Sequence, residues 1–164
     1  MFIISDAKVE DISSIIEIAE KTWWPTYQHI LTPEQIRYML DAIYAPEILE
    51  SQITLGLQRY LMLRNESGTQ GFASYGPRQD DPDTYKVHKL YVLPDNHKRG
   101  YGRALLEEIK TRLARMDKHR LDLNVNRHNP ALKFYEGLGF RIVREEDVPI
   151  GPYWMNDYVM TLEF

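Results

Sequence analysis

The chain has no cysteine among its 164 residues. This absence excludes disulfide bonds, a thiolate nucleophile and every metal site that needs a cysteine ligand. Long apolar runs are missing too, so no membrane-spanning helix is predicted. The first residues, MFIISDAKVEDISS, are acidic and lack the basic segment and apolar run of a secretory signal. We therefore expect a soluble, cytoplasmic protein without disulfides or a membrane-bound part.

An excess of positive charge is also missing, because the formal net charge is −4 at pH 7. Proteins that bind nucleic acids are usually basic overall, so no nucleic-acid partner is expected. The length is that of one compact domain, and 43% hydrophobic residues suffice for a core. The sequence contains no repeat, low-complexity tract or long linker, and residues 1–164 are expected to form a single domain.

Hydrophobic periodicity predicts a chain that alternates strands and helices. Apolar residues recur at helical spacing from Val9 to Ala19. Thr32, Pro33 and Gln35 have the pattern of an N-cap, a first-turn proline and a capping box, and another helix is expected near Pro46. Strands are expected at residues 2–5, 60–64, 71–75, 84–93, 121–125, 140–143 and 158–164, with helices around 105–113 and 129–137. This order predicts a mixed α/β sheet with helices on both faces.

The segment KLYVLPDNHKRGYGRALLEEIK places a basic, glycine-containing loop between an apolar strand and an amphipathic helix. A helix N-terminus already carries partial positive charge, so additional cations there indicate an anionic ligand. Gly100 and Gly102 allow the backbone to approach a phosphate, and Lys98, Arg99 and Arg103 can meet its charge. A solvated basic turn is the alternative. The spacing fits neither a Walker A loop nor a dinucleotide fingerprint.

Two blocks, YVLPDNHKRGYGRALL and LDLNVNRHNPALKFYEGLGF, together resemble the signature of the GNAT N-acetyltransferase superfamily. The first family block reads Gln/Arg-x-x-Gly-x-Gly/Ala, and His97 stands here at its first position. The second block, Asn-x-x-Ala-x-x-Phe-Tyr-x-x-x-Gly-Phe, has its asparagine out of register: His128 holds the usual place, Asn129 follows it, and Asn126 is a second candidate. The residues that match the second block are Ala131, Phe134, Tyr135, Gly139 and Phe140.

The resemblance implies a GNAT-type sheet, mostly antiparallel and splayed at its central strands, with helices on both faces. It also implies acetyl-coenzyme A (acetyl-CoA) as cosubstrate. Strand residues would bind the pantetheine arm, and loop residues would bind the pyrophosphate. The implied cofactor-binding residues are Leu90, Tyr91, Val92, His97, Lys98, Arg99, Gly100, Tyr101, Gly102, Arg103 and Asn129.

The same resemblance places Tyr135 beside the sulfur of the cofactor. A phenol, with an ordinary pKa near ~10, can protonate the leaving thiolate; a buried core tyrosine is the alternative. His88 is the candidate base, because a strand with period two puts it on one face with Leu90 and Val92. A structural histidine or a water chain are alternatives. Without cysteine, direct transfer is favoured over a thiol ping-pong route. No metal is expected.

Trp23, Trp24 and Tyr27 lie in the segment that lines the acceptor site in this family. Aromatic faces can hold a cation or pack an alkyl chain, although a plain core contact is the alternative. The following helices carry several carboxylates, and a small cationic amine is therefore the expected acceptor, as in the bacterial polyamine-type acetyltransferases that the chain loosely resembles. A non-catalytic acyl-CoA-binding module and a nucleotide-binding regulatory domain are the alternative functions. A homodimer is left open.

Overall fold

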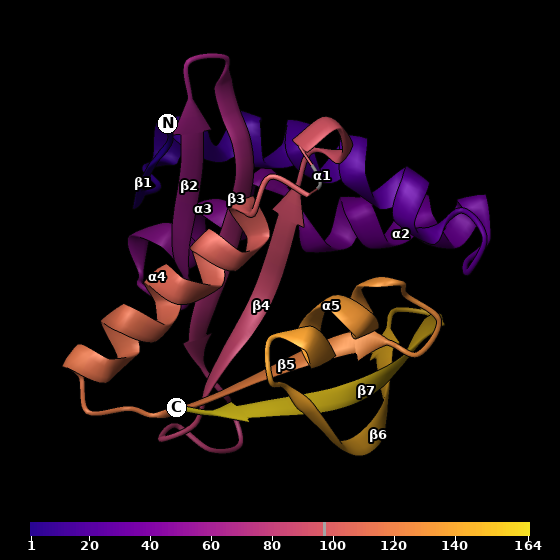
Figure 1. Cartoon of the computed structure of the whole chain (residues 1–164). Coiled ribbons are helices and arrows are strands. Elements are labelled where there is room, and N and C mark those ends of the chain that lie inside the picture. The colour runs from indigo at the N-terminus through magenta and orange to yellow at the C-terminus, as the bar shows by residue number, and fades with distance from the viewer. Residues whose placement is uncertain (97) are drawn as a thin grey trace.

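The computed structural model describes residues 1–96 and 98–164, whose strands form one seven-stranded sheet in the order β1-β2-β3-β4-β5-β7-β6 (Figure 1). All neighbouring strands are antiparallel except β4 and β5, which run parallel. The strands are β1 (Ile3–Asp6), β2 (Arg59–Asn65), β3 (Gly68–Pro77), β4 (Tyr85–Val92), β5 (Arg120–Asn126), β6 (Arg141–Ile150) and β7 (Tyr153–Glu163).

Helices cover both faces of the sheet, as predicted. Helix α4 packs on β2, β3 and β4 from one side, and α5 packs on β5 (Figure 1). Helix α1 packs on β3 and β4, and α3 on β2, with apolar side chains of α1–α3 in a second core. The helices are α1 (Ile12–Tyr27), α2 (Pro33–Ile43), α3 (Pro46–Thr54), α4 (Tyr101–Arg115) and α5 (Ala131–Gly137), with short 3₁₀ turns η1 (Val9–Asp11) and η2 (Pro94–Asn96).

Two apolar cores lie on opposite faces of the sheet. The first, here called the α4–α5 core, includes Leu105 and Ile109 of α4 together with Leu121 of β5. The second, the α1–α3 core, includes Ile15 of α1 and Phe72 of β3. Each core buries its side chains almost completely, which accounts for the nearly continuous burial of β2 and β3 between them.

The start of α2 and the end of the sheet differ in detail from the expectation. Thr32 accepts a hydrogen bond from the amide of Gln35 at 3.2 Å, as an N-cap does. The Gln35 side chain instead donates to the carbonyl of Trp154 at 2.9 Å, so the capping box stays half formed. Strands β6 and β7 form a longer hairpin than predicted. The prediction was too short because β6 is exposed along most of its length and lacks an apolar pattern.

Strands β4 and β5 pair over only three positions, Tyr85–Leu121, Lys86–Asp122 and Val87–Leu123. Beyond these pairs the two strands diverge, and Figure 1 shows the separation widening toward their C-terminal ends. The expected splayed, mostly antiparallel sheet is therefore confirmed. The gap between the diverging ends is here called the β4–β5 gap.

A β-bulge interrupts β4 at the start of this gap. Lys89 faces Ser74 of β3, whereas Val87 faces Tyr75, so His88 is an extra residue without a partner on β3. Such a bulge breaks the alternation of side chains along a strand.

The broken alternation changes which side chains share a face. Val87 belongs to the α4–α5 core, and Leu90 packs against the same core although it lies three residues later. Tyr91, the next residue, packs against the α1–α3 core. The bulge lies at His88 itself, so the expectation that His88 shares a face with Leu90 and Val92 stays a prediction.

Candidate functional site

Three buried tyrosines from different elements lie close to one another beside the β4–β5 gap. Tyr91 comes from the diverging end of β4, Tyr27 from the end of α1 and Tyr135 from α5. Burial raises the pKa of each phenol, and the Tyr27 phenol adds electrostatically to the shift at the other two. All three phenols are therefore protonated at neutral pH and can serve as proton or hydrogen-bond donors.

Tyr135 is held rigidly beside the gap. Its side chain is buried, and its ring packs edge-to-face on Phe134 and Phe140 with centroids 5.3 and 5.8 Å apart. Among the described residues its hydroxyl has no hydrogen-bond partner, which leaves it available to a ligand. The role of Tyr135 as the proton donor stays a prediction.

The displaced asparagine of the second block can now be located. Asn126 is buried, and its side chain accepts from the His128 amide at 2.9 Å and donates to Met155 Sδ at 3.2 Å. Asn129 accepts from the amide of Ala131 at 2.9 Å, which fixes the start of α5, and its amide group lies beside the Tyr27 phenol. Of the two asparagines, Asn129 is thus the one whose side chain lies beside Tyr27.

The basic loop leads into α4 through left-handed backbone. Gly100 has φ 79° at the N-cap of α4, and Lys98 has φ 73°. Lys98, Arg99 and Arg103 are exposed, and none of them forms an ion pair with another described residue. Their charge is therefore uncompensated at a helix N-terminus, as the sequence predicted for an anion site. His97 lies outside the described residues.

Tyr101, also expected among the cofactor-binding residues, points away from the exposed loop. Its side chain is 7% exposed, its hydroxyl accepts from Asn65 Nδ2 at 3.1 Å, and its ring packs on Phe2. The side chain therefore anchors the first turn of α4, and only its backbone lies with the loop.

His88, the expected base, has the chemistry of a neutral imidazole. Burial lowers its pKa to about 3, and the nearby ammonium groups of Lys86 and Lys89 lower it further. Its Nε2 is buried without a hydrogen-bond partner among the described residues. A group with so low a pKa is a weak proton acceptor near neutral pH.

The aromatic residues of α1 separate into two environments. The Trp23 ring is buried and packs on Tyr27, Tyr44 and Tyr91 at centroid distances of 4.7, 6.1 and 6.2 Å. Trp24 lies elsewhere, and its indole N–H donates to Glu20 at 3.2 Å. Trp23 is thus buried against these tyrosines, whereas Trp24 is partly buried against the same α1–α3 core and directs its N–H to Glu20.

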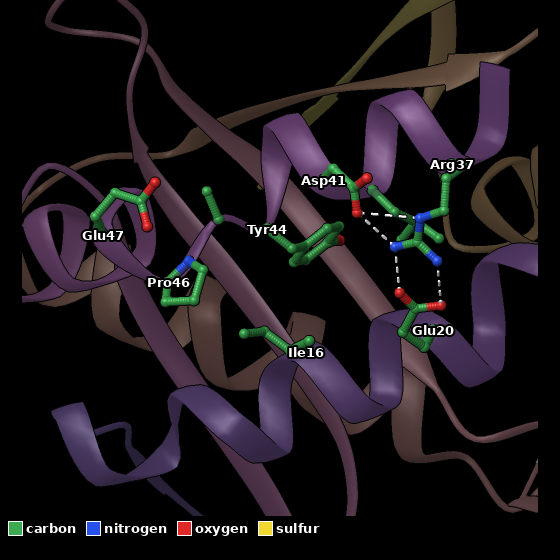
Figure 2. Close-up of a pocket in the computed structure, with 9 residues that line it drawn as sticks. Ile16, Glu20, Arg37, Asp41, Tyr44, Pro46 and Glu47 are labelled. Carbon is green, nitrogen blue, oxygen red and sulfur yellow. Dashed lines mark hydrogen bonds and ion pairs between the residues drawn. The ribbon is translucent and has the colours of Figure 1, made fainter. Parts of the chain in front are cut away.

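A separate hollow of about 390 Å³ lies between α1, α2 and the start of α3 (Figure 2). Arg37 spans it, pairing with Glu20 through two nitrogens and with Asp41 at 2.7 Å. These carboxylates are thereby neutralised. The acidic character of α2 thus contributes less to the attraction of a cation than its sequence suggests.

Asp157 is a buried carboxylate that the sequence reasoning missed. It lies on β7, is 6% exposed, and accepts a hydrogen bond from Asn124 Nδ2 at 3.2 Å. Burial raises its pKa to about 6. The segment MNDYVM contains it, but the strand was expected to begin only at residue 158, so nothing indicated that this side chain points inward.

The described part of the chain holds no group of three His, Cys, Asp or Glu side chains suited to a metal ion. Within the same residues, no helix has the length and apolar character needed to cross a membrane.

Comparisons with known proteins agree with this geometry. Residues 28–156 match the family described as an acetyltransferase (GNAT) domain. The chain is 28% identical over 153 residues to the uncharacterized N-acetyltransferase YuaI of Bacillus subtilis, covering 92% of this chain and 86% of YuaI. It is 29% identical over 154 residues to an uncharacterized N-acetyltransferase of Mycobacterium tuberculosis, covering 93% and 97% of the two chains.

Solved structures share the fold along the whole chain. The PaiA N-acetyltransferase of Thermoplasma acidophilum, solved in complex with coenzyme A, matches with a TM-score of 0.86 at 23% identity, covering 100% of this chain and 99% of that one. The ribosomal-protein-S18-alanine N-acetyltransferase of Escherichia coli matches with a TM-score of 0.73 at 21% identity, covering 99% and 94%.

Among the described strands, β4 and β5 are the only parallel pair, and the sheet splays between them. This splay, with the basic start of α4 beside it, is the arrangement of a GNAT-type acetyltransferase. The chain belongs to the GNAT acetyltransferase family. It is accordingly an N-acetyltransferase, with acetyl-CoA as its cosubstrate.

Proposed function

We propose that residues 1–164 act as one catalytic domain that transfers an acetyl group from acetyl-CoA directly to the amine of a small, cationic acceptor. The observation that carries this proposal is the β4–β5 gap, which has an uncompensated basic helix start at one end and the phenol of Tyr135 beside it. A cofactor in the gap would meet both.

The cofactor would lie with its pyrophosphate against the amides and cations of residues 98–103. The pantetheine arm would follow the diverging end of β4 along Leu90, Tyr91 and Val92, with Asn129 on the opposite side. His97 keeps its predicted role at the pyrophosphate. The left-handed φ of Gly100 supports this placement, because it turns the chain directly into the helix N-terminus.

In the chemical step the acceptor nitrogen would attack the thioester carbonyl, and Tyr135 would protonate the departing sulfur. The raised pKa of Tyr135 suits this role, because the phenol reaches the reaction with its proton in place. His88 stays a prediction as the base. Its pKa of about 3 favours the alternative that another group or a water chain takes the proton from the amine.

The acceptor would enter from the α1–α3 side, where the Trp23 and Tyr27 rings pack on each other and would offer it an aromatic surface. Trp24 keeps its predicted role in acceptor binding, but it would contribute less than Trp23 and Tyr27 because its indole N–H already donates to Glu20. Cationic amines fit these faces better than anionic metabolites do.

An amine panel assay tests the proposal against its main alternative, a non-catalytic acyl-CoA-binding module. Release of free thiol from acetyl-CoA is followed with polyamines, lysine-like amines, a peptide with an N-terminal alanine, and neutral and acidic amines. We expect turnover with small cationic amines. Tight acetyl-CoA binding without turnover on any amine would favour the binding module, and turnover on acidic amines alone would overturn the acceptor class.

A further inference from the structure

Asp157 lies on the face of the sheet that the acceptor would approach. Along β7, Tyr158 and Met160 pack against the α4–α5 core, whereas Met155 belongs to the α1–α3 core. Alternation along the strand therefore places Asp157 on the same face as Met155. Its backbone pairs with Asn126 of β5, the last residue of that strand before the chain turns toward α5.

The Asp157 carboxylate is buried but only half satisfied. Its Oδ2 accepts from Asn124 Nδ2, while its Oδ1 has no hydrogen-bond partner among the described residues. No described cation comes within 4 Å of either oxygen. Oδ1 is not among the fully enclosed polar atoms that lack a partner, so a hydrogen-bond donor can reach it from outside the protein.

Charged groups approach this carboxylate from each neighbouring element without neutralising it. Lys86 of β4 and Arg127, which follows β5, favour its ionised form, whereas Glu146 of β6 opposes it. Arg127 is already paired with Asp147 at 2.9 Å. From α1, the Tyr27 phenol lies within electrostatic reach of the carboxylate.

Two further polar atoms of this region are buried without partners among the described residues, Asn124 Oδ1 and His88 Nε2. Asn124 touches Asp157 directly, and His88 is the bulge residue at the start of the gap. Asn124 Oδ1 is a hydrogen-bond acceptor, so Asn124 and the Asp157 carboxylate together offer two acceptor groups to an N–H donor.

We infer that Asp157 binds the primary ammonium group of the acceptor through Oδ1 and then takes its proton, with Asn124 as the residue that positions the carboxylate. This inference rests on the proposed acetyl transfer and adds to it a proton acceptor on β7, where the sequence had indicated His88 on β4.

The reaction removes two protons from the acceptor nitrogen. The acceptor ammonium gives one proton to the Asp157 carboxylate, and the neutral nitrogen then attacks the thioester carbonyl. As the C–N bond is completed and the C–S bond breaks, the sulfur takes the Tyr135 proton and becomes the free thiol. The nitrogen loses its second proton, which restores the Tyr135 phenol, and Asp157 releases the first proton to solvent.

The acidity of the two candidate bases supports the same assignment. The pKa of Asp157 is raised to about 6, close to the operating pH, whereas that of His88 is lowered to about 3. A general base works best when its pKa lies near the working pH. Asp157 is ionised at neutral pH and can hold a proton transiently, which His88 does far less well.

The test compares Asp157→Asn with Asp147→Asn, a matched control on the adjacent strand whose carboxylate is exposed and turned toward Arg127. kcat/KM for the best amine is measured from pH 5 to 9, with the Kd of acetyl-CoA and the melting temperature for each protein. We expect Asp157→Asn to lower kcat/KM by roughly 10²–10⁴-fold and to lose the acidic limb near pH 6, with an unchanged cofactor Kd. Asp147→Asn should match the parent.

Asn124→Ala supplies an independent readout. Its hydrogen bond lowers the pKa of Asp157, so its removal should move the acidic limb of kcat/KM to higher pH. An unmoved limb in Asn124→Ala, or Asp157→Asn activity within threefold of the parent, would overturn the inference. Absence of turnover by the parent on every amine would instead refute the proposed function, so the two failures are distinguishable.

Discussion

The ring of Phe134 covers Gly102: a Cβ atom placed on residue 102 would stand 3.3 Å from the Cζ of Phe134. This contact joins α5 to the first turn of α4, the two helices that flank the β4–β5 gap on one face of the sheet. Gly102 lies in ordinary helical backbone, so a side chain there is limited by the space under the Phe134 ring and not by the backbone conformation. Gly100, by contrast, needs its glycine for a left-handed φ of 79°.

Replacing Gly102 by Val should weaken acetyl-CoA binding more than it weakens folding. The branched side chain would push against the Phe134 ring, which is 40% exposed and can move, and would project into the start of the cofactor site. Titration calorimetry should show a cofactor Kd raised at least tenfold, roughly 1.4 kcal/mol. Gly137→Ala, where nothing lies within 4 Å, is the control. An unchanged Kd in the Val variant would remove the loop from the site.

Replacing Tyr135 by Phe should lower kcat by roughly 10²–10⁴-fold at an unchanged cofactor Kd, because the ring still packs and only the proton donor is lost. Steady-state kinetics with the best amine measure the effect. Tyr85→Phe, at the opposite end of β4, controls for loss of a phenol in the same core. Turnover that stays within twofold of the parent would end the acid role.

Acetyl-CoA should raise the melting temperature, because it binds the folded chain and not the unfolded one. At about 100 times its Kd the gain in free energy of unfolding is ~2.7 kcal/mol. Differential scanning fluorimetry with coenzyme A, ATP and adenosine checks this. Equal shifts from ATP and coenzyme A would point to a nucleotide-binding domain.

A buried ion pair joins the β3–β4 connection to β5. Arg78 lies 3.3 Å from Asp122, and their side chains are 10% and 2% exposed. Replacing Arg78 by Met removes one partner of the carboxylate, which keeps Arg120 at 3.3 Å and Thr161 at 2.7 Å, and should lower the free energy of unfolding by roughly 1.5–3 kcal/mol. Arg141→Met, which breaks an exposed pair with Glu163, should cost no more than about 1 kcal/mol. Equal losses in urea unfolding would contradict this difference.

Asp157→Asn should make the fold more stable at neutral pH. The pKa of Asp157 rises from 3.8 to about 6 on folding, so the folded chain binds more protons between these values and loses stability as the pH rises through them. Two pKa units correspond to a loss of ~3 kcal/mol in the free energy of unfolding, and this loss is complete above about pH 6. Urea unfolding should show the variant ahead of the parent at pH 7 and level with it near pH 4. A difference that does not change with pH would refute the linkage.

The candidate residues that could be proposed from the sequence are those whose position depends on their neighbours along the chain. Gly100 and Tyr135 were predicted because each stands in a short motif whose local backbone determines its place. Asp157 and the bulge at His88 escaped, because both depend on the register between strands distant in sequence. Strand β6 is exposed and polar on both faces, so its sequence lacks the alternation of apolar residues that would have predicted the full length of the final hairpin.

The three residue pairs between β4 and β5 have a mechanical consequence. They are the only described backbone pairing between a half made of β1–β4 and a half made of β5–β7. The two halves are therefore joined through the sheet by a short stretch of backbone hydrogen bonds. A molecule that binds both Leu90 in the first half and Asn129 in the second would form an additional connection between them. Its arrival should slow amide hydrogen exchange in β5 and β7 as well as in β4, although it touches only their edges.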